Sequence, residues 1–393
     1  RYGCIFFSYS GKSIIKTLEK KLPIDVKKSN SEVILLVSTN KGGFIYYSDE
    51  KRRFWEVNGP YLLGSIVHHM ILDPRDSKTI LMAAQTKIHG PMVFKSQDFG
   101  MNWVPVKNPP QFSVSKKVAH IYRLTPGHAS EPNVWYAGSS PQGLFKSDDF
   151  GDTWKEVDGF NNNPKLNQWC ERAAASTLKY EKLHSIMIHP ENPLSIKIGM
   201  ASGGVFESMD GGDSWTPMND GLLASDVDDS LGRSPHLVLQ HPTNPDRIYQ
   251  QNQRGVFRLD MKTRKWEHIG KDIDVGDIGF SLCIHPKDPD TLWVFPMEGT
   301  DIWSRVCTGG QPAVYCSQDG GKSWFRQDIG FPMWHAWFTV LNKAMITDDF
   351  DSVGVYLGTT NGSIWHSDNG GNSWRQIVTH LPKIYALEVG YIN

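Results

Sequence analysis

Short apolar segments alternate with polar turns along almost the whole chain. Between residues 184 and 218 they read HSIMIHP, SIKIGMAS, GGVFES and TPM, and the segments are rich in β-branched and aromatic side chains. Short apolar segments that end at Gly, Pro or polar residues are typical of β-strands, since a buried helix needs a longer periodic stretch. The pattern therefore predicts an all-β chain.

A polar octet that ends in Trp recurs at a spacing of about fifty residues. Two eroded copies, SDEKRRFW and LDMKTRKW, fill the gaps in the series, so there are seven copies in all. A repeat of this length with several short strands is the signature of a propeller blade, because one sheet cannot bury both of its faces alone. We therefore predict a seven-bladed β-propeller of four-stranded blades over residues 31–393. The five complete octets are SQDFGMNW, SDDFGDTW, SMDGGDSW, SQDGGKSW and SDNGGNSW, which end at Trp103, Trp154, Trp215, Trp324 and Trp374.

The two ends of the chain differ from the repeat. The first repeat begins at SEVILLVSTNKGGFIYYSD and supplies only the second, third and fourth strands of a blade, whereas the chain finishes on an unpartnered strand, IYALEVGYIN. We predict that this last strand becomes the innermost strand of blade one, because this closes the ring and removes two sheet edges. Residues 1–30 lie outside the repeat, and we expect a short βα extension there.

The octet has the composition of a structural turn. Its Ser and Asp can accept hydrogen bonds from backbone amides, its Gly takes a positive φ, and its Trp packs between blades. Asn369 replaces Asp in the last copy, which a turn cap tolerates but a catalytic carboxylate does not. We therefore assign a structural role to the octet residues Asp98, Trp103, Asp149, Trp154, Asp210, Gly212, Trp215, Asp319, Trp324, Asn369 and Trp374.

The pattern S-x-D-x-G-x-[TS]-W resembles the Asp-box, or BNR, repeat of the sialidase-like propellers, over roughly residues 31 to 393. Families with this repeat include sialidases, xyloglucan-cleaving glycosidases, the sortilin ectodomain and photosystem II assembly factors that are not enzymes. The layout is most similar to bacterial proteins described only as "glycosyl hydrolase, BNR repeat" or "exo-alpha-sialidase". The resemblance implies that function lies at the end of the ring opposite the octets.

The octets and the turns after each first strand are expected at one end of the ring. TDDFDS, with Asp348, Asp349 and Asp351, is one of these turns, and we expect it to be surface turn chemistry. The opposite end, which we call the mouth, is formed by the links that lead into each first strand and those between second and third strands. The candidate ligand-binding residues there are His68, His120, Arg172, His184, Arg233, His236, Gln251, Asn252, Arg254, Arg305, Trp334, His335 and Trp337.

Catalysis on a glycan would require two carboxylates that face each other across a sugar. Glu171, Asp277, Glu298 and Asp301 are the candidates, and the alternative is that they are solvated loop acids. A genuine sialidase is not expected, because the Arg-Ile-Pro signature of that family is missing. The four histidines that approach the channel from consecutive blades could hold a metal, but histidines hydrogen-bonded to backbone or water are commoner, so we expect neither a metal nor another cofactor.

Composition limits the classes of partner that the protein is expected to bind. The 41 basic and 42 acidic residues give a net charge of -1, which argues against nucleic acid, and no apolar run is long enough to span a membrane. Five cysteines without a repeating spacing favour a reducing, cytoplasmic location, although a start at Arg1 leaves an exported form open. Our first hypothesis is a propeller that binds a partner protein or a small polar ligand at the mouth. The alternative is a glycoside hydrolase or lyase that uses a carboxylate pair there, and both catalysis and oligomeric state stay open.

Overall fold

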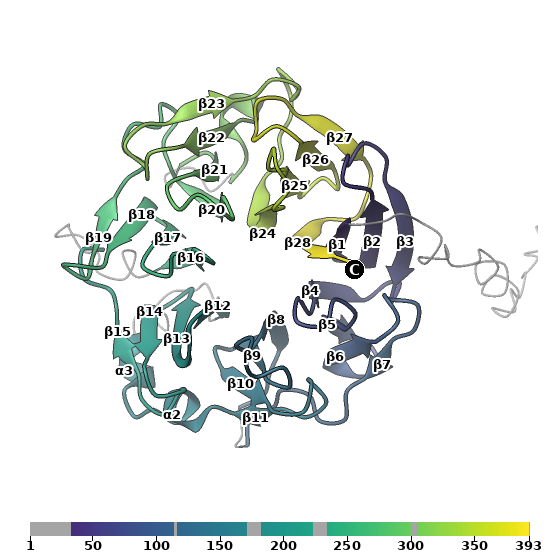
Figure 1. Cartoon of the computed structure of the whole chain (residues 1–393), viewed down its shortest axis with the longest axis vertical. Coiled ribbons are helices and arrows are strands. Elements are labelled where there is room, and N and C mark those ends of the chain that lie inside the picture. The colour runs from purple at the N-terminus through teal and green to yellow at the C-terminus, as the bar shows by residue number, and fades with distance from the viewer. Residues whose placement is uncertain (1–32, 114–115, 171–181, 223–233, 300–304, 393) are drawn as a thin grey trace, which may run out of the picture.

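The chain forms a ring of blades around a central channel (Figure 1). The computed structural model describes residues 33–113, 116–170, 182–222, 234–299 and 305–392. In these ranges, five antiparallel sheets have four strands each, and one larger sheet has eight because it joins two blades. The ring therefore has seven four-stranded blades, and the predicted all-β propeller is confirmed. The predicted extension at residues 1–30 lies outside the described residues.

Each blade runs from an inner strand at the channel to an outer strand at the rim (Figure 1). The inner strands, from blade one to blade seven, are β28 (Ile384–Tyr391), β4 (Ile66–Leu72), β8 (His120–Pro126), β12 (Leu183–His189), β16 (Pro235–Gln240), β20 (Gly279–Ile284) and β24 (Val340–Thr347). The second strands are β1 (Val33–Thr39), β5 (Ile80–Thr86), β9 (Trp135–Ser140), β13 (Asn192–Met200), β17 (Ile248–Asn252), β21 (Leu292–Pro296) and β25 (Val355–Thr359). The third strands are β2 (Gly42–Ser48), β6 (Gly90–Ser96), β10 (Leu144–Ser147), β14 (Gly204–Ser208), β18 (Gly255–Asp260), β22 (Val314–Ser317) and β26 (Ile364–Ser367). The outer strands are β3 (Glu56–Tyr61), β7 (Val104–Pro105), β11 (Lys155–Glu156), β15 (Thr216–Pro217), β19 (Lys265–His268), β23 (Phe325–Gln327) and β27 (Arg375–Val378).

Apolar side chains fill the spaces between neighbouring blades. Tyr136 of blade three, for example, belongs to the same buried cluster as Ile196 and Ile198 of blade four. Strands covered on both faces read as continuous apolar runs, and all seven residues of β1 are buried. The short helices α2 (Asp158–Asn161) and α3 (Leu166–Cys170) and the 3-10 turn η2 (Thr308–Gly310) lie in links between strands. Within the described ranges, no helix is long and apolar enough to cross a membrane.

The C-terminal strand closes the ring. β28 pairs antiparallel with β1 along its length, and a parallel bridge between Lys343 and Ala386 connects it to β24 of blade seven. The chain end thus supplies the innermost strand of blade one, as predicted. Ile384, Ala386 and Leu387 of this strand are buried, so closure also completes the apolar core between the first and last blades.

The octets form tight turns between the third and outer strands. In blade four, Ser208 Oγ accepts the amide of Gly212 at 2.8 Å, and Asp210 Oδ1 accepts the amide of Ser214 at 2.9 Å. Gly212 has a φ of +107°, and an added Cβ would lie 2.8 Å from Val157, so both the turn and the close approach require glycine. The Trp215 indole donates to the Gly212 carbonyl at 3.0 Å and packs edge-on against Phe160 of α2.

The last octet makes the same turn with an amide in place of the carboxylate. Asn369 Oδ1 accepts the amide of Ser373 at 3.0 Å, which is the bond that Asp210 makes in blade four. The motif therefore needs an oxygen acceptor at this position and does not need its charge. Equivalent bonds are made by Asp98, Asp149 and Asp319.

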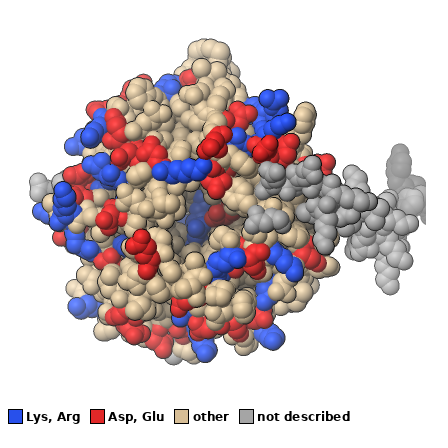
Figure 2. Space-filling view, in the orientation of Figure 1, with Lys and Arg blue, Asp and Glu red and all other residues tan. Residues whose placement is uncertain are grey.

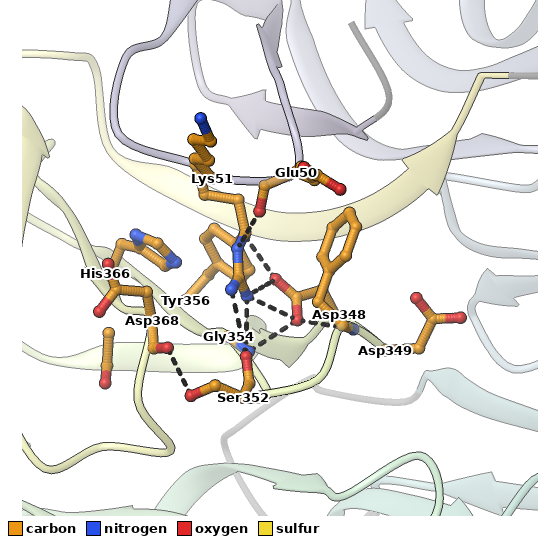
Figure 3. A network of polar contacts seen from close by, with 12 residues as sticks. Glu50, Lys51, Asp348, Asp349, Ser352, Gly354, Tyr356, His366 and Asp368 are labelled. Carbon is orange, nitrogen blue, oxygen red and sulfur yellow. Dashed lines mark hydrogen bonds and ion pairs between the residues drawn. The ribbon is translucent and has the colours of Figure 1, made fainter.

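Blade one has an eroded octet, and a buried ion pair joins it to blade seven. Arg52 Nη1 lies 2.8 Å from Asp348 Oδ2, and the two residues are 5% and 1% exposed. Asp348 also accepts the hydroxyl of Tyr356 at 2.8 Å and the amide of Gly354 at 2.6 Å (Figure 3). The expectation that all three acids of TDDFDS are surface residues is therefore wrong for Asp348, because the Arg52 guanidinium is buried here and requires a carboxylate. Asp349 and Asp351 are exposed.

Candidate functional site

The inner strands share an irregularity near the mouth end of the channel. In β4, Val67 pairs with Ala84 and His69 pairs with Ala83, so His68 is an extra residue that has no partner of its own in the ladder. A β-bulge of this kind bends the strand and turns its extra residue out of the regular alternation. The corresponding extra residues are Tyr122 in β8, His184 in β12, His236 in β16, Phe280 with Ser281 in β20, and Tyr385 in β28, whereas β24 is irregular over Leu341–Ala344.

These side chains meet around the channel, and we call His68, Tyr122, His184, His236, Phe280 and Tyr385 the collar. The ring of His68 lies 4.9 Å from that of Tyr122 and 5.7 Å from that of Tyr385, so it contacts the blades on both sides of its own. His236 and Phe280 are 4.8 Å apart in the same way. The bulges thus place one aromatic or imidazole ring from each of six blades at the mouth end of the channel.

His68 is the member of the collar that lacks hydrogen bonds. Its side chain is 7% exposed, and neither ring nitrogen has a partner among the described residues. Burial, and to a smaller extent His120 and Lys182, lowers the pKa of His68 to about 3, so the ring is neutral at pH 7. A neutral imidazole has one N–H donor and one nitrogen acceptor, and neither is used by another described residue. His120 lies next to it, with ring centroids 4.9 Å apart.

The other two collar histidines contribute to the structure of the ring. His184 Nε2 lies 2.8 Å from the carbonyl oxygen of Pro235, and His236 Nδ1 lies 2.7 Å from that of Gly279. Each histidine therefore connects its own blade to the start of the next inner strand. The four histidines do not form one cluster, and the described part of the chain holds no group of three or more His, Cys, Asp or Glu placed to bind a metal.

Cationic side chains lie over three aromatic rings of the collar. Lys182 Nζ is 4.7 Å from the ring centre of Tyr122, Lys383 Nζ is 5.6 Å from that of Tyr385, and the Arg305 guanidinium is 5.2 Å from that of Phe280. Cation–π contacts at these distances hold the cations at the rim of the channel. Figure 2 shows Lys and Arg side chains within the central hollow. The mouth therefore presents aromatic rings and positive charge together.

A second polar group lies deeper in the channel and joins three blades. Glu388 Oε1 of β28 accepts Arg123 Nη1 of β8 at 2.7 Å and lies 2.9 Å from His69 Nε2 of β4. His69 Nδ1 accepts the amide of Leu124 at 3.3 Å, which leaves Nε2 as the protonated nitrogen. Burial alone would raise the pKa of Glu388, but Arg123 and His69 reverse this and lower it to about 2. Glu388 is therefore an anion at neutral pH.

Two of the four acids predicted at the mouth, Asp277 and Glu298, lie among the described residues. Glu171 and Asp301 lie outside the described residues, as do the predicted Arg172 and Arg233. Asp277 Oδ2 accepts the amide of Val256 at 2.8 Å and lies 2.7 Å from His268 Nε2, whereas Glu298 Oε1 accepts the amide of Gly309 at 3.0 Å. Each described carboxylate is thus hydrogen-bonded within the chain.

The links between second and third strands contain both buried and accessible groups. Gln251 and Asn252 are fully buried, and Gln251 Nε2 donates to the Asp277 carbonyl at 2.9 Å. The Arg254 amide donates to Asn252 Oδ1 at 3.1 Å, which shapes the turn that follows β17. Arg305 reaches the collar, as described above.

The link into blade seven exposes two tryptophans. Trp334 and Trp337 are 66% and 57% exposed, and His335 between them is exposed as well, with a φ of +59°. The inter-blade packing at this link comes instead from Phe331, which stacks on Trp374, and from Phe338. The two indoles are therefore surface groups at the mouth.

Some residues of the channel were absent from the predicted site. Arg123, Lys343 and Glu388 are charged residues within the otherwise apolar inner strands HIYRLTP, VLNKAMIT and IYALEVGY. A charge in the middle of a strand that is buried on both faces is the signal that could have identified them.

A comparison with known protein families finds no family model that matches the chain. Comparisons with curated proteins and with solved structures both find xyloglucanases. A xyloglucanase of Paenibacillus sp is 22% identical in an alignment of 308 residues, and the match covers 69% of this chain and 27% of that protein. The crystal structure of a GH74 xyloglucanase from Xanthomonas campestris has a TM-score of 0.62 at 18% identity and covers 89% of this chain and 53% of that one. The structure of YCF48 bound to D1 peptide has a TM-score of 0.51 at 12% identity, with 94% and 97% covered.

The chain is thus a β-propeller that shares its fold with GH74 xyloglucanases and YCF48 and has distant sequence similarity to xyloglucanases. It spans about a quarter to a third of the length of the curated xyloglucanases that it matches. At these identities the likeness establishes the fold alone.

Proposed function

We propose that this protein is a binding propeller that recognises a partner protein or a small polar ligand at the mouth. The observation that carries the proposal is His68, which is buried in the collar with both ring nitrogens unpaired among the described residues. Leaving a buried polar group without a partner costs about 1–3 kcal/mol, so a ligand that supplies a donor and an acceptor here gains that free energy on binding.

Other groups at the mouth suit a polar chain or a protein surface. Trp334 and Trp337 offer exposed aromatic area, and Trp and Arg are the residue types that dominate binding energy in protein interfaces. The cations over the collar rings favour ligands that carry negative charge or carbonyl groups. The likeness to a peptide-bound YCF48, which is matched over nearly its whole length, supports a role for a single propeller as a binder.

A carbohydrate-active enzyme is the alternative, and the distant xyloglucanase relatives favour it. An acid and a nucleophile or base must present open carboxylate oxygens to a sugar. Asp277 and Glu298 instead accept hydrogen bonds from backbone amides of this chain. A catalytic pair would therefore need Glu171 or Asp301, which lie outside the described residues.

One experiment separates the two functions. The protein, immobilised, is used to capture partners from its native source, in parallel with a Trp334→Ala/Trp337→Ala variant and a Met209→Ala control. Met209 is 58% exposed and lies in an octet turn at the opposite end of the ring. We expect the double variant to lose at least tenfold of the captured partner, about 1.4 kcal/mol, and the control to lose none.

The same preparations are incubated with xyloglucan oligosaccharides and assayed for new reducing ends. No release is expected. Release that Glu298→Gln or Asp301→Asn abolishes would establish the enzyme instead, and equal capture by all three proteins would show that the mouth is not the binding surface.

A further inference from the structure

A cavity of about 320 Å³ lies in the channel between the inner strands of blades three, four, five and seven. It follows β12 and β16 as far as the turns at Pro190 and Pro242, which lie at the octet end of the ring. This volume is at the small end of the range for ligand pockets, which is roughly 300–1,000 Å³. The cavity therefore extends toward the opposite end of the ring from the collar and suits a small molecule.

Two cations from other blades line the cavity, namely Arg123 of β8 and Lys343 of β24. Arg123 uses Nη1 for Glu388 and Nε for Thr125, whereas its Nη2 has no acceptor among the described residues. Lys343 has no hydrogen bond or ion pair within the described part of the chain. Glu388 is the carboxylate near both, so one anion faces two cations whenever Lys343 is protonated.

The remaining walls combine apolar and unpaired polar groups. Ile188 and Leu237 are among the apolar lining residues. Gln240 Oε1 and His241 Nε2 belong to lining residues and are buried without a hydrogen-bond partner among the described residues. The cavity thus pairs two cationic groups with an apolar wall and a second polar position.

We propose that this cavity binds a short organic carboxylate that carries a second polar group. Its carboxylate lies between Lys343 Nζ and Arg123 Nη2, its short apolar body lies against β12 and β16, and its second polar group reaches Gln240 and His241. A carboxylate matches two donors from two side chains, whereas a phosphate dianion would need more donors than the described walls supply.

Binding has a predicted proton signature. Burial, and after it the charge of Arg123, lowers the pKa of Lys343 well below its ordinary value, and Glu388 offsets this only in part. An anion beside the amine favours the charged form, so Lys343 takes up a proton from the buffer when the carboxylate binds. The titratable or charged groups that face this region from the other blades are His69 of β4, Arg123 of β8, His184 of β12, His241 directly after β16 and Glu388 of β28.

These neighbours do not change charge near neutral pH. Burial lowers the pKa of His69 to about 3 and lowers those of His184 and His241, so the three rings stay neutral. Glu388, with its pKa lowered to about 2 by Arg123 and His69 against the effect of burial, stays ionised. Lys343 is therefore the group that accounts for proton uptake.

The test is isothermal titration calorimetry on the full chain with butyrate, 4-hydroxybutyrate, inorganic phosphate and butylamine. Each is titrated at pH 7.5 in buffers of different ionisation enthalpy, for the wild type, Lys343→Met and Lys155→Met. Lys155 is an exposed lysine of the outer strand β11 and is the matched control for the loss of one lysine. Thermal unfolding of Lys343→Met checks folding, and no loss is expected because an apolar side chain of similar length replaces a buried amine.

We expect 4-hydroxybutyrate to bind more tightly than butyrate, with net uptake of protons, and butylamine not to bind. Lys343→Met should weaken binding at least tenfold and abolish proton uptake, while Lys155→Met leaves both unchanged. The proposal is wrong if no carboxylate binds, if phosphate binds more tightly than either carboxylate, or if Lys343→Met binds as the wild type does. If Lys343→Met fails to fold, the number of protons that the wild type takes up on binding tests the role of Lys343. Binding to the wild type without proton uptake would contradict the proposal. Because the collar is not altered, failure here leaves the proposal for the mouth intact.

Discussion

The ion pair between Arg52 and Asp348 joins the first blade to the last, so its removal should destabilise the whole ring. Arg52 donates to the carboxylate of Asp348 and to the carbonyl of Ser352 at 3.1 and 3.2 Å, and almost no solvent reaches the pair. Although burial disfavours the charged guanidinium, the hydrogen bond and charge of Asp348 keep the pKa of Arg52 raised. Arg52 is therefore a buried cation in the folded protein, and the Asp348 carboxylate is its partner.

Removing one partner leaves the other charge buried and unpaired, which costs about 3–5 kcal/mol. We expect Arg52→Met and Asp348→Leu each to lower the free energy of unfolding by that amount. The double variant should lose about 2–3 kcal/mol less than the sum of the two single losses, because its second substitution removes an unpaired charge. The assay is urea denaturation followed by tryptophan fluorescence, with the slope against urea checked for constancy.

The matched control is the exposed pair between Lys287 and Asp351, which lies in the same turn region. Water and salt screen such a pair, so Lys287→Met should leave the urea midpoint unchanged. Additive losses in the double variant, or an Arg52→Met protein as stable as Lys287→Met, would refute the reasoning that a buried, coupled ion pair closes the ring.

Three further predictions concern closure, the channel and the octets. Deletion of residues 384–393 should abolish the cooperative unfolding transition in differential scanning calorimetry, because it removes the inner strand of blade one. The deletion also removes the buried Ile384 and Leu387, whose burial stabilises the fold by about 1.5–3 kcal/mol each. A protein that still melts cooperatively would contradict closure of the ring by this strand. The folded pKa of Glu388 is lowered, so its ionised side chain stabilises the folded protein above the unfolded pKa near 4.5, and this stabilisation is lost as the pH falls toward 2. Glu388→Gln should therefore lower the free energy of unfolding by about 3 kcal/mol at pH 7, and urea titrations should show this difference shrinking to zero in acid. A difference that does not change with pH would count against the assignment. Asp210→Asn should keep the wild-type melting temperature, because Asn369 makes the same hydrogen bond in blade seven, whereas Asp210→Ala should lose about 1 kcal/mol of stability with its turn cap. Equal losses of stability in the two variants would mean that the charge matters.

The fold was predictable because the octet repeats with one turn chemistry. A Ser, an Asp or Asn and a Gly at fixed offsets specify a local turn, and Asn369 in the sequence already indicated that charge was unnecessary. Closure by the last strand followed from counting strands at the two ends. These features depend on local sequence or on simple arithmetic, so no distant contact had to be known.

The channel and the ring closure were less accessible to sequence reasoning. A bulge adds one residue to a strand without changing its apolar character, so the placement of His68, Tyr122 and Tyr385 in one collar is visible only in the register. Arg52 and Asp348 are nearly 300 residues apart, and nothing local pairs them. The eroded octet of blade one was a sign that another interaction had replaced it.

The measurement that tests the central proposal most directly compares cross-linking from the two ends of the ring. A photoreactive benzoylphenylalanine is placed at Trp337, at the mouth, or at Met209, in an octet turn, and each protein is irradiated in extract from its native source. Both positions are more than half exposed, so the probe is accessible at either end. We predict a discrete cross-linked partner from position 337 that a His68→Phe substitution abolishes, and none from position 209. The same partner captured from position 209 alone, or capture from 337 that His68→Phe leaves unchanged, would contradict binding at the collar.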